Sequence, residues 1–209
     1  MKFDLAMENY GMDYYMWDAG KPYWDGYAGK LPVKDGEQAS QEASGTDRYF
    51  NSNKAQFHAV NACKVCPNAN EAALYVFRGD PHWDETTLWV KNKHLYKGGM
   101  WFLKQAKITG FRADQAYDGT DWCTNGNSNS WSVSQTLPDA ADAGNYFYLP
   151  ALGYYTSGQL YYVGDIGYYW SSSAYPGYSN YAYYLYFISG SVGVRNYGRN
   201  SGSRAEALQ

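Results

Sequence analysis

The sequence predicts an α+β domain in which helices precede a tyrosine-rich antiparallel sheet. Aromatic residues make up 19% of the 209 residues, and fifteen of the 24 tyrosines lie between Tyr146 and Tyr197. In this last third, short runs rich in tyrosine and valine alternate with glycine-containing turns, which is typical of strands in a sheet. The middle third instead carries residue patterns that favour the starts and ends of helices.

Residues 1–46 are predicted to lie outside this domain. Residues 1–30 contain many aromatic side chains without regular spacing, among them Trp17 and Trp24, and we interpret them as an arm that packs on a neighbouring surface. Residues 34–46 are polar and contain several glycines and serines, which is typical of a linker. The domain is therefore expected to span residues 47–209, and the arm would serve for oligomerisation or for attachment to a larger particle.

Two helices are expected after the linker. Residues 54–62 favour the first. The second begins with Asn68 as its cap, because Glu71 follows three residues later and its carboxylate can reach back to the cap. A run of apolar residues continues this helix, and Pro81 marks its end.

The remainder of the middle third is expected to hold less regular structure. Residues 86–90 predict a short strand, and residues 100–108 fit either a short helix or a strand. Residues 112–145 are rich in loop-forming types, and within them residues 125–130 predict an exposed turn.

The last third predicts five strands, which are 146–149, 160–163, 168–171, 181–187 and 191–195. Side chains alternate between the two faces of a strand, so Leu185 and Phe187 share one face with Tyr181 and Tyr183. This set is the better core face. By the same rule Val192 and Val194 point inward, and the outward positions are Ser191, Gly193 and Arg195.

Charge and composition narrow the classes of function. The formal net charge of −3 argues against a nucleic-acid surface. No apolar run approaches the roughly 18 residues that would cross a membrane. Acidic residues near Met1 predict that a secretory signal is absent or already removed. A chain rich in tyrosine, glycine, serine and asparagine, with few charges, instead favours a binding surface.

The three cysteines do not make a disulfide framework. Cys63 and Cys66 have the spacing of a metal or redox pair, and Cys123 stands apart. A zinc site would need a fourth ligand, for which the candidates are His58, His82 and His94. A redox pair would need a thioredoxin-like βαβ pattern, which does not surround these residues. We favour buried thiols in or beside a helix, and we expect no metal and no cofactor.

Catalysis and calcium-dependent sugar binding are rival hypotheses. No histidine lies in a recognised nucleophile motif, although Cys123 with a histidine would make a dyad if the fold brought them together. Calcium requires several oxygen ligands, and five aspartates of the middle loops would have to gather to supply them. These are Asp114, Asp118, Asp121, Asp139 and Asp142. We favour solvated loops and a chain that is not an enzyme.

Several blocks of sequence carry a resemblance to a known family. The most specific are LPALGYY at residues 149–155 and YWSSS at residues 169–173, and further blocks lie at 61–71, 79–83, 94–99, 118–122, 146–148 and 180–187. With these blocks, residues 47–209 resemble the C-type-lectin-fold variable proteins that retroelements diversify in gut Bacteroidales and their phages. That group overlaps the Fibrobacter major paralogous domain family.

The resemblance implies a C-type lectin fold, usually without calcium, and a variable region at about 168–204 whose codons are rewritten at adenines. It implies a scaffold made of Trp170, Leu185, Phe187, Val192 and Val194. It also implies twelve ligand-contacting positions, which are Gly177, Tyr178, Ile188, Ser191, Gly193, Arg195, Asn196, Tyr197, Gly198, Asn200, Ser201 and Ser203.

The function implied by the resemblance is that of a hypervariable ligand- or receptor-binding protein. Its partner would be a protein or glycan on a cell surface, and the protein itself would be exposed on a virion or a bacterial surface. A structural module associated with a pilus or virion, and a surface glycan-binding lectin, are the alternatives.

Overall fold

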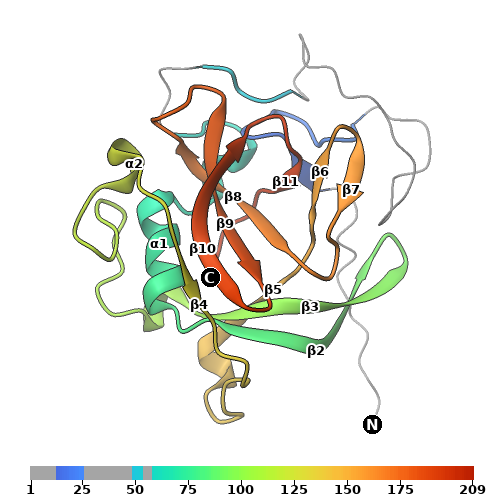
Figure 1. Cartoon of the computed structure of the whole chain (residues 1–209), viewed down its shortest axis with the longest axis vertical. Coiled ribbons are helices and arrows are strands. Elements are labelled where there is room, and N and C mark those ends of the chain that lie inside the picture. The colour runs from blue at the N-terminus through green and yellow to red at the C-terminus, as the bar shows by residue number, and fades with distance from the viewer. Residues whose placement is uncertain (1–12, 26–48, 54–57) are drawn as a thin grey trace.

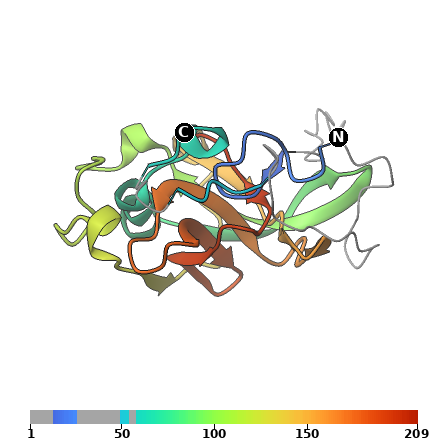
Figure 2. The same ribbon diagram turned by 90° about the horizontal axis from the view of Figure 1, so that it is seen from above.

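The computed structural model describes residues 13–25, 49–53 and 58–209. These residues form an α+β domain, as the sequence predicts, with a six-stranded sheet, a three-stranded sheet, a small two-stranded hairpin and two α-helices (Figure 1). Helix α1 lies beside β10 on one side of the domain, and the hairpin of β6 and β7 lies on the other side (Figures 1 and 2).

The six-stranded sheet has the order β1-β11-β8-β9-β10-β4. Its neighbouring strands are antiparallel, except that β11 runs parallel to β8. The three central strands confirm the predicted strands of the last third and extend beyond them. The strands are β1 (Tyr14–Tyr15), β4 (Asn129–Ser132), β8 (Gly167–Ala174), β9 (Tyr181–Ile188), β10 (Ser191–Gly198) and β11 (Ser203–Arg204).

The three-stranded sheet consists of β2 (His82–Lys91), β3 (His94–Leu103) and β5 (Tyr146–Pro150), all antiparallel. Residues 100–108 therefore begin as a strand and end in the short 3₁₀ helix η2 (Gln105–Lys107). A further 3₁₀ turn, η3 (Ala143–Asn145), leads into β5. The strand β7 (Gln159–Tyr161) covers the first half of the strand predicted at 160–163, and it pairs with β6 (Tyr154–Thr156) in a hairpin.

Helix α1 (Ala69–Arg78) confirms the second predicted helix. Asn68 accepts a hydrogen bond from the Glu71 amide, and the Glu71 carboxylate accepts one from the Asn68 amide, which completes the predicted capping box. Helix α2 (Trp122–Asn125) is a single turn capped by Asp121. It lies within the loop-rich segment and was not expected.

The helix predicted at 54–62 is not formed over the residues that the structure describes. His58 makes an isolated β-bridge with Ser173, and the amide of Ala59 donates to the carbonyl of Ser172. A 3₁₀ turn, η1 (Ala62–Val65), follows. Pairing with the exposed backbone of β8 overrides the local helix preference of this segment. Residues 54–57 lie outside the described residues.

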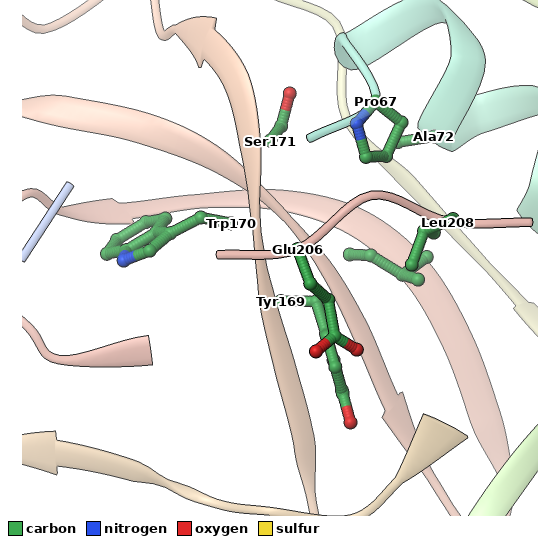
Figure 3. A pocket seen from close by; sticks show the side chains of 8 residues that line it. Pro67, Ala72, Tyr169, Trp170, Ser171, Glu206 and Leu208 are labelled. Carbon is green, nitrogen blue, oxygen red and sulfur yellow. The ribbon is translucent and has the colours of Figure 1, made fainter. Parts of the chain in front are cut away.

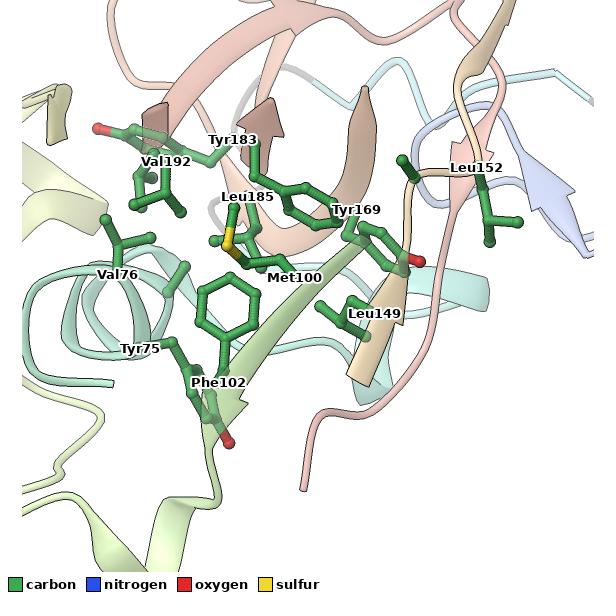
Figure 4. Close-up of a cluster of buried hydrophobic side chains, with 14 of the residues drawn as sticks. Tyr75, Val76, Met100, Phe102, Leu149, Leu152, Tyr169, Tyr183, Leu185 and Val192 are labelled. Atoms are coloured by element: carbon green, nitrogen blue, oxygen red, sulfur yellow. The ribbon is translucent and has the colours of Figure 1, made fainter. Parts of the chain in front are cut away.

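The main core lies between the two larger sheets and α1 (Figure 4). Tyr183, Leu185 and Phe187 of β9 face it, as the strand alternation predicts. Val192 and Val194 of β10 join them, and Met100 and Phe102 of β3 pack from the other sheet. All these side chains are fully or almost fully buried.

A second cluster covers part of the opposite face of the six-stranded sheet, and we call it the outer-face cluster. Its buried members are Trp17, Cys63, Cys66, Trp170, Ala174, Ala182, Tyr184 and Tyr186. The segment around residue 17 and the turn η1 therefore lie against the back of β8 and β9. Both faces of β9 are packed, which explains why its outward tyrosines are more buried than a solvated sheet face would leave them.

Residues 13–25 belong to the domain itself, which corrects the expected boundary at residue 46. Tyr14 and Tyr15 pair with Arg204 and Ser203. The Trp17 indole donates to the carbonyl of Ser171 at 2.9 Å, and Tyr23 and Trp24 are buried in the main core. Irregular aromatic spacing therefore reflects insertion between existing elements and not an arm. Residues 1–12 and 26–48 of the predicted arm and linker lie outside the described residues.

The C-terminal residues pass over β8 and the start of α1 (Figure 3). Leu208 packs against the main core, and the amide of Gln105 donates to the carbonyl of Gln209 at 2.7 Å. The guanidinium of Arg204 contacts Asp13 at 3.1 Å and Glu206 at 2.6 Å. Burial opposes the charge of Arg204, but these two carboxylates outweigh it and hold its pKa above the ordinary value.

Candidate recognition face

The register of β10 decides which of its side chains point away from the main core. Residues opposite each other on antiparallel strands share a face. Arg195 lies opposite Tyr184 and Gly193 lies opposite Tyr186, whereas Val194 lies opposite the core residue Leu185. Arg195 and Gly193 therefore belong to the outer face.

Seven tyrosines gather on and beside this outer face, and we call them the tyrosine face. They are Tyr154, Tyr161, Tyr162, Tyr168, Tyr184, Tyr186 and Tyr197. The rings of Tyr168 and Tyr184 are stacked with centroids 4.5 Å apart, and Tyr154 lies 4.5 Å from Tyr168 on its other side. Tyr197 meets Tyr154 edge to face at 5.8 Å.

The hairpin of β6 and β7 extends the tyrosine face beyond the sheet. Tyr162 follows the hairpin, is 47% exposed and contacts the rings of Tyr154 and Tyr161. Its φ of 59° lies in the left-handed region, which costs a residue with a Cβ about 1–2 kcal/mol. The surrounding fold holds this backbone in an unfavourable conformation and presents the ring to solvent.

Arg195 supplies a positive charge on this face. Its guanidinium carbon lies 4.2 Å from the ring centroid of Tyr186, which is a cation–π contact. One guanidinium nitrogen also donates to the hydroxyl of Ser130 on β4 at 3.3 Å. From residue 146 to the end, the other charged side chains are Asp165, Arg199, Arg204 and Glu206. Both of those arginines are buried, so Arg195 is the accessible cation of this region.

Three phenols of the tyrosine face, those of Tyr184, Tyr154 and Tyr168, stay protonated at neutral pH. Burial is the main cause that raises the pKa of Tyr184 to about 12, and it also raises the pKa values of Tyr154 and Tyr168. Neighbouring phenols add to the rise at Tyr154 and Tyr168. The half-buried Tyr154 and Tyr168 therefore contribute neutral hydroxyl groups, which both donate and accept hydrogen bonds, to a face that also holds the Arg195 guanidinium.

The twelve predicted contact positions differ in exposure. Gly177, Tyr178, Arg195 and Asn200 are exposed, and Ile188, Ser191, Asn196, Tyr197 and Gly198 are half-buried. Of these, Ser191, Arg195 and Tyr197 alternate along the outer face of β10. Asn196 lies opposite Tyr183, so it belongs to the end of the core-facing side.

Three of the twelve positions are corrected, because they are buried. Ser201 and Ser203 are 2% and 1% exposed, since the chain here passes between the N-terminal segment and β8. Gly193 is also buried: a Cβ at this position would lie 2.5 Å from the carbonyl oxygen of Asn129 on β4. These side chains are not available to a ligand in this structure.

Among the described residues, Tyr178 is the most exposed large hydrophobic side chain, at 62%, but it lies in a separate group. It occupies the turn between β8 and β9, where its ring contacts Tyr175 and Tyr181. The Tyr175 hydroxyl donates to the carbonyl of Gly126 after α2. Tyr178 therefore belongs to the loop end of the sheet, and Tyr197 and Arg195 belong to the tyrosine face.

Sequence reasoning missed the contribution of tyrosines outside the predicted positions. Tyr154 and Tyr161 come from the hairpin, Tyr162 directly follows it, and Tyr168 comes from β8. The signal was the doubled tyrosine at 154–155, 161–162 and 168–169. In the pairs 154–155 and 168–169, the second ring is buried in the core and the first stays nearer the surface. In the pair 161–162 the strand ends between the two residues, and both rings stay on the tyrosine face.

The rival site residues have local structural contacts. Asp118 accepts bonds from Thr120 and from the Trp122 indole, and Asp121 caps α2 and accepts a bond from Asn70. Asp114 pairs with Arg112. Within residues 13–25, 49–53 and 58–209, no three or more side chains of His, Cys, Asp or Glu gather in a way that would hold a metal ion.

No protein-family model, curated protein or solved structure matches this chain. Across the described ranges, no helix has the length and apolar character needed to cross a membrane.

Proposed function

We propose that this chain is a hypervariable ligand- or receptor-binding protein with a C-type lectin fold, and that a retroelement diversifies its outward C-terminal residues. It acts by recognition and not by catalysis. Its ligand is a protein or glycan on a cell surface, and the chain is displayed on a virion or a bacterial surface.

The observation that carries this proposal is the difference between the inward and the outward side chains of β10. Val192 and Val194 are fully buried in the main core, while Arg195 and Tyr197 alternate with them on the outer face. Changes to exposed side chains that take no part in packing usually alter stability by about 0.5 kcal/mol or less. Arg195 and Tyr197 can therefore vary at a smaller cost in stability than the buried Val192 and Val194, which keep the sheet intact.

The composition of the face supports recognition of a macromolecule. Tyrosine and arginine are the residue types that most often dominate binding energy at interfaces. Tyrosine also offers a large contact area at low entropic cost, because its side chain has only two rotatable torsions. The rings of the tyrosine face brace one another at 4.5–6.4 Å, which keeps the surface preorganised.

A binding experiment tests the proposal. The chain is probed against protein and glycan arrays, and the strongest ligand is titrated against Tyr197→Ala, Arg195→Ala and Arg195→Lys. We expect each alanine variant to weaken binding more than about tenfold. Lysine should restore only part of the loss, because it keeps the charge but lacks the planar guanidinium.

Leu95→Ala is the matched control, because Leu95 is exposed on β3 and lies outside the tyrosine face. Binding that is indifferent to all three face variants would contradict the proposal. Sequencing the coding DNA tests the diversification separately: we expect a nearby near-copy of the short stretch that encodes the predicted variable region, differing only at template adenines. Uniform silent drift there would favour the structural module.

A further inference from the structure

We propose that Cys63 and Cys66 form a dithiol site that closes into an intrachain disulfide when the chain folds in the presence of a disulfide oxidant. The inference is independent of the proposed function, because it rests on the turn η1 and on the outer-face cluster.

The turn η1 brings the two cysteines together. Residues 62–65 form a 3₁₀ helix, and the amide of Cys66 donates to the carbonyl of Cys63 at 3.1 Å. Side chains three residues apart are eclipsed in a 3₁₀ helix. A turn of this kind holds its end Cα atoms within about 7 Å, which overlaps the span of about 4.4–6.8 Å that a disulfide requires.

The surroundings hold this pair in place and separate it from the third cysteine. Both side chains are buried in the outer-face cluster beside Trp17 and Trp170. The amide of Asp18 also donates to the Cys63 sulfur at 3.1 Å. Cys123 lies in the main core, where its sulfur contacts the hydroxyl of Ser173 at 3.3 Å. It therefore has a different partner and should remain a thiol.

The chemistry is thiol–disulfide exchange. One cysteine thiolate attacks a sulfur of oxidised glutathione, which releases one glutathione thiol and leaves a mixed disulfide. The second cysteine then attacks the protein sulfur of that mixed disulfide and releases the second glutathione thiol. The protein loses two electrons and two protons, and one molecule of oxidised glutathione is reduced to two thiols.

The burial of the two thiols in the folded chain means that the exchange takes place before folding is complete. Cys63 is 0% exposed and Cys66 is 6% exposed, so an oxidant has little access to the folded pair. Burial, with a smaller contribution from Cys66, raises the pKa of the Cys63 thiol, which lowers the fraction of reactive thiolate. Only two residues separate the cysteines, so they meet readily in the unfolded chain. Closure therefore accompanies folding, and the folded protein then shields the bond from reductants.

The test uses the full chain, unfolded in denaturant and refolded with a mixture of oxidised and reduced glutathione. Free thiols are then titrated after a second denaturation, and the intact mass is measured. We expect one free thiol in place of three, and a mass about 2 Da lower than that of the reduced chain. Peptide mapping should place the bond between Cys63 and Cys66.

Two variants make the assignment specific. Cys66→Ser should keep two titratable thiols with no loss of mass, and Cys123→Ser should retain none after oxidative refolding. The oxidised wild-type chain should also unfold at a higher temperature than the reduced chain. Three free thiols after refolding, a stable glutathione adduct or a bond to Cys123 would each overturn the proposal. The wild-type measurement stands even if a variant does not fold.

Discussion

Single side chains of this domain are fixed by dense local hydrogen bonding as well as by burial. Asp84 is the clearest case, because its carboxylate accepts bonds from the amides and hydroxyls of Thr86 and Thr87 and from the Trp101 indole. These contacts coincide with the shift in register between β2 and β3. Burial opposes the charge, but the donors outweigh it and lower the pKa of Asp84 to about 2.

This carboxylate makes the stability of the protein depend on pH in the acid range. The pKa of Asp84 is lower in the folded chain than the ordinary value of about 3.9, so the folded state binds fewer protons. The resulting stabilisation is complete above about pH 4 and is lost as the pH falls towards 2. We expect the free energy of unfolding, measured with urea, to fall over this range in the wild-type chain.

Asp84→Asn should be less stable at neutral pH and should lack this part of the acid dependence. Asp139→Asn is the control, because Asp139 is exposed in the loop before η3, and its acid profile should follow that of the wild type. If the free energy of unfolding fell with pH in the same way in Asp84→Asn and in the wild type, the donors around Asp84 would not be the source of this acid dependence.

At the scale of elements, the edge strand β4 determines which positions of β10 can change. β4 pairs with the first half of β10, from Ser191 opposite Ser132 to Val194 opposite Asn129. Beyond Val194 the strand has no partner on this side among the described residues, and the outward side chains there are Arg195 and Tyr197. The freely accessible part of β10 is therefore its second half.

Substitution of Gly193 tests this pairing. Its added Cβ would lie 2.5 Å from the Asn129 carbonyl oxygen and 2.8 Å from the Ser130 Cβ, so β4 must move. We expect Gly193→Ala to lower the free energy of unfolding by about 1–3 kcal/mol, as overpacking does elsewhere. Gly190→Ala is the matched control, since a Cβ there meets no atom within 4 Å. Equal stability of the two variants in urea would mean that β4 is only loosely paired.

The elements that the sequence predicted well are those whose signals are local. The Asn68–Glu71 capping box and the alternation of Val192 and Val194 depend on neighbours within a few residues. The first two residues of β4 lie within 125–130, for which the sequence predicts an exposed turn because asparagine and serine favour turns. Only the distant partner β10 makes β4 a strand. The misassigned exposure of Gly193 follows directly from that missing strand.

The candidate site also has parts that depend on local sequence and parts that depend on distant contacts. Arg195 and Tyr197 could be placed on the outer face from strand alternation alone. The burial of Ser201 and Ser203 depends on β1, more than 180 residues earlier in the chain, which no local pattern announces. The position of Tyr154 on the tyrosine face could not be predicted from local sequence either, because the rings it contacts come from β8 and β10.

At the scale of the whole molecule, the N-terminal segment is a structural part of the sheet. Trp17 is fully buried, its ring lies 4.4 Å below the Arg199 guanidinium, and its indole bonds to β8. The amide of Trp17 also donates to the carbonyl of Arg199 at 2.8 Å. Residues close to the two ends of the chain thus depend on each other for burial.

Trp17→Ala tests whether this segment is integral or dispensable. Removing a fully buried tryptophan typically costs about 3–5 kcal/mol, and the loss also leaves Arg199 without its aromatic partner. We expect a clear fall in the thermal unfolding midpoint. Val60→Ala, at a position that is 60% exposed, should leave the midpoint nearly unchanged. If Trp17→Ala were as stable as the wild type, the result would support the prediction that this segment is an arm outside the domain.

The pairing of β1 with β11 has a mechanical consequence. Tension applied between Asp13 and Glu206 would act on this contact, in which two residue pairs, Tyr14–Arg204 and Tyr15–Ser203, are joined by the strand ladder and Arg204 also pairs with Asp13. The force would pass through the short pairing of β1 with β11 and not through the longer hydrogen-bonded ladder between β9 and β10. When these two segments are pulled apart, we therefore expect this short contact to break before β10, the strand that carries Arg195 and Tyr197.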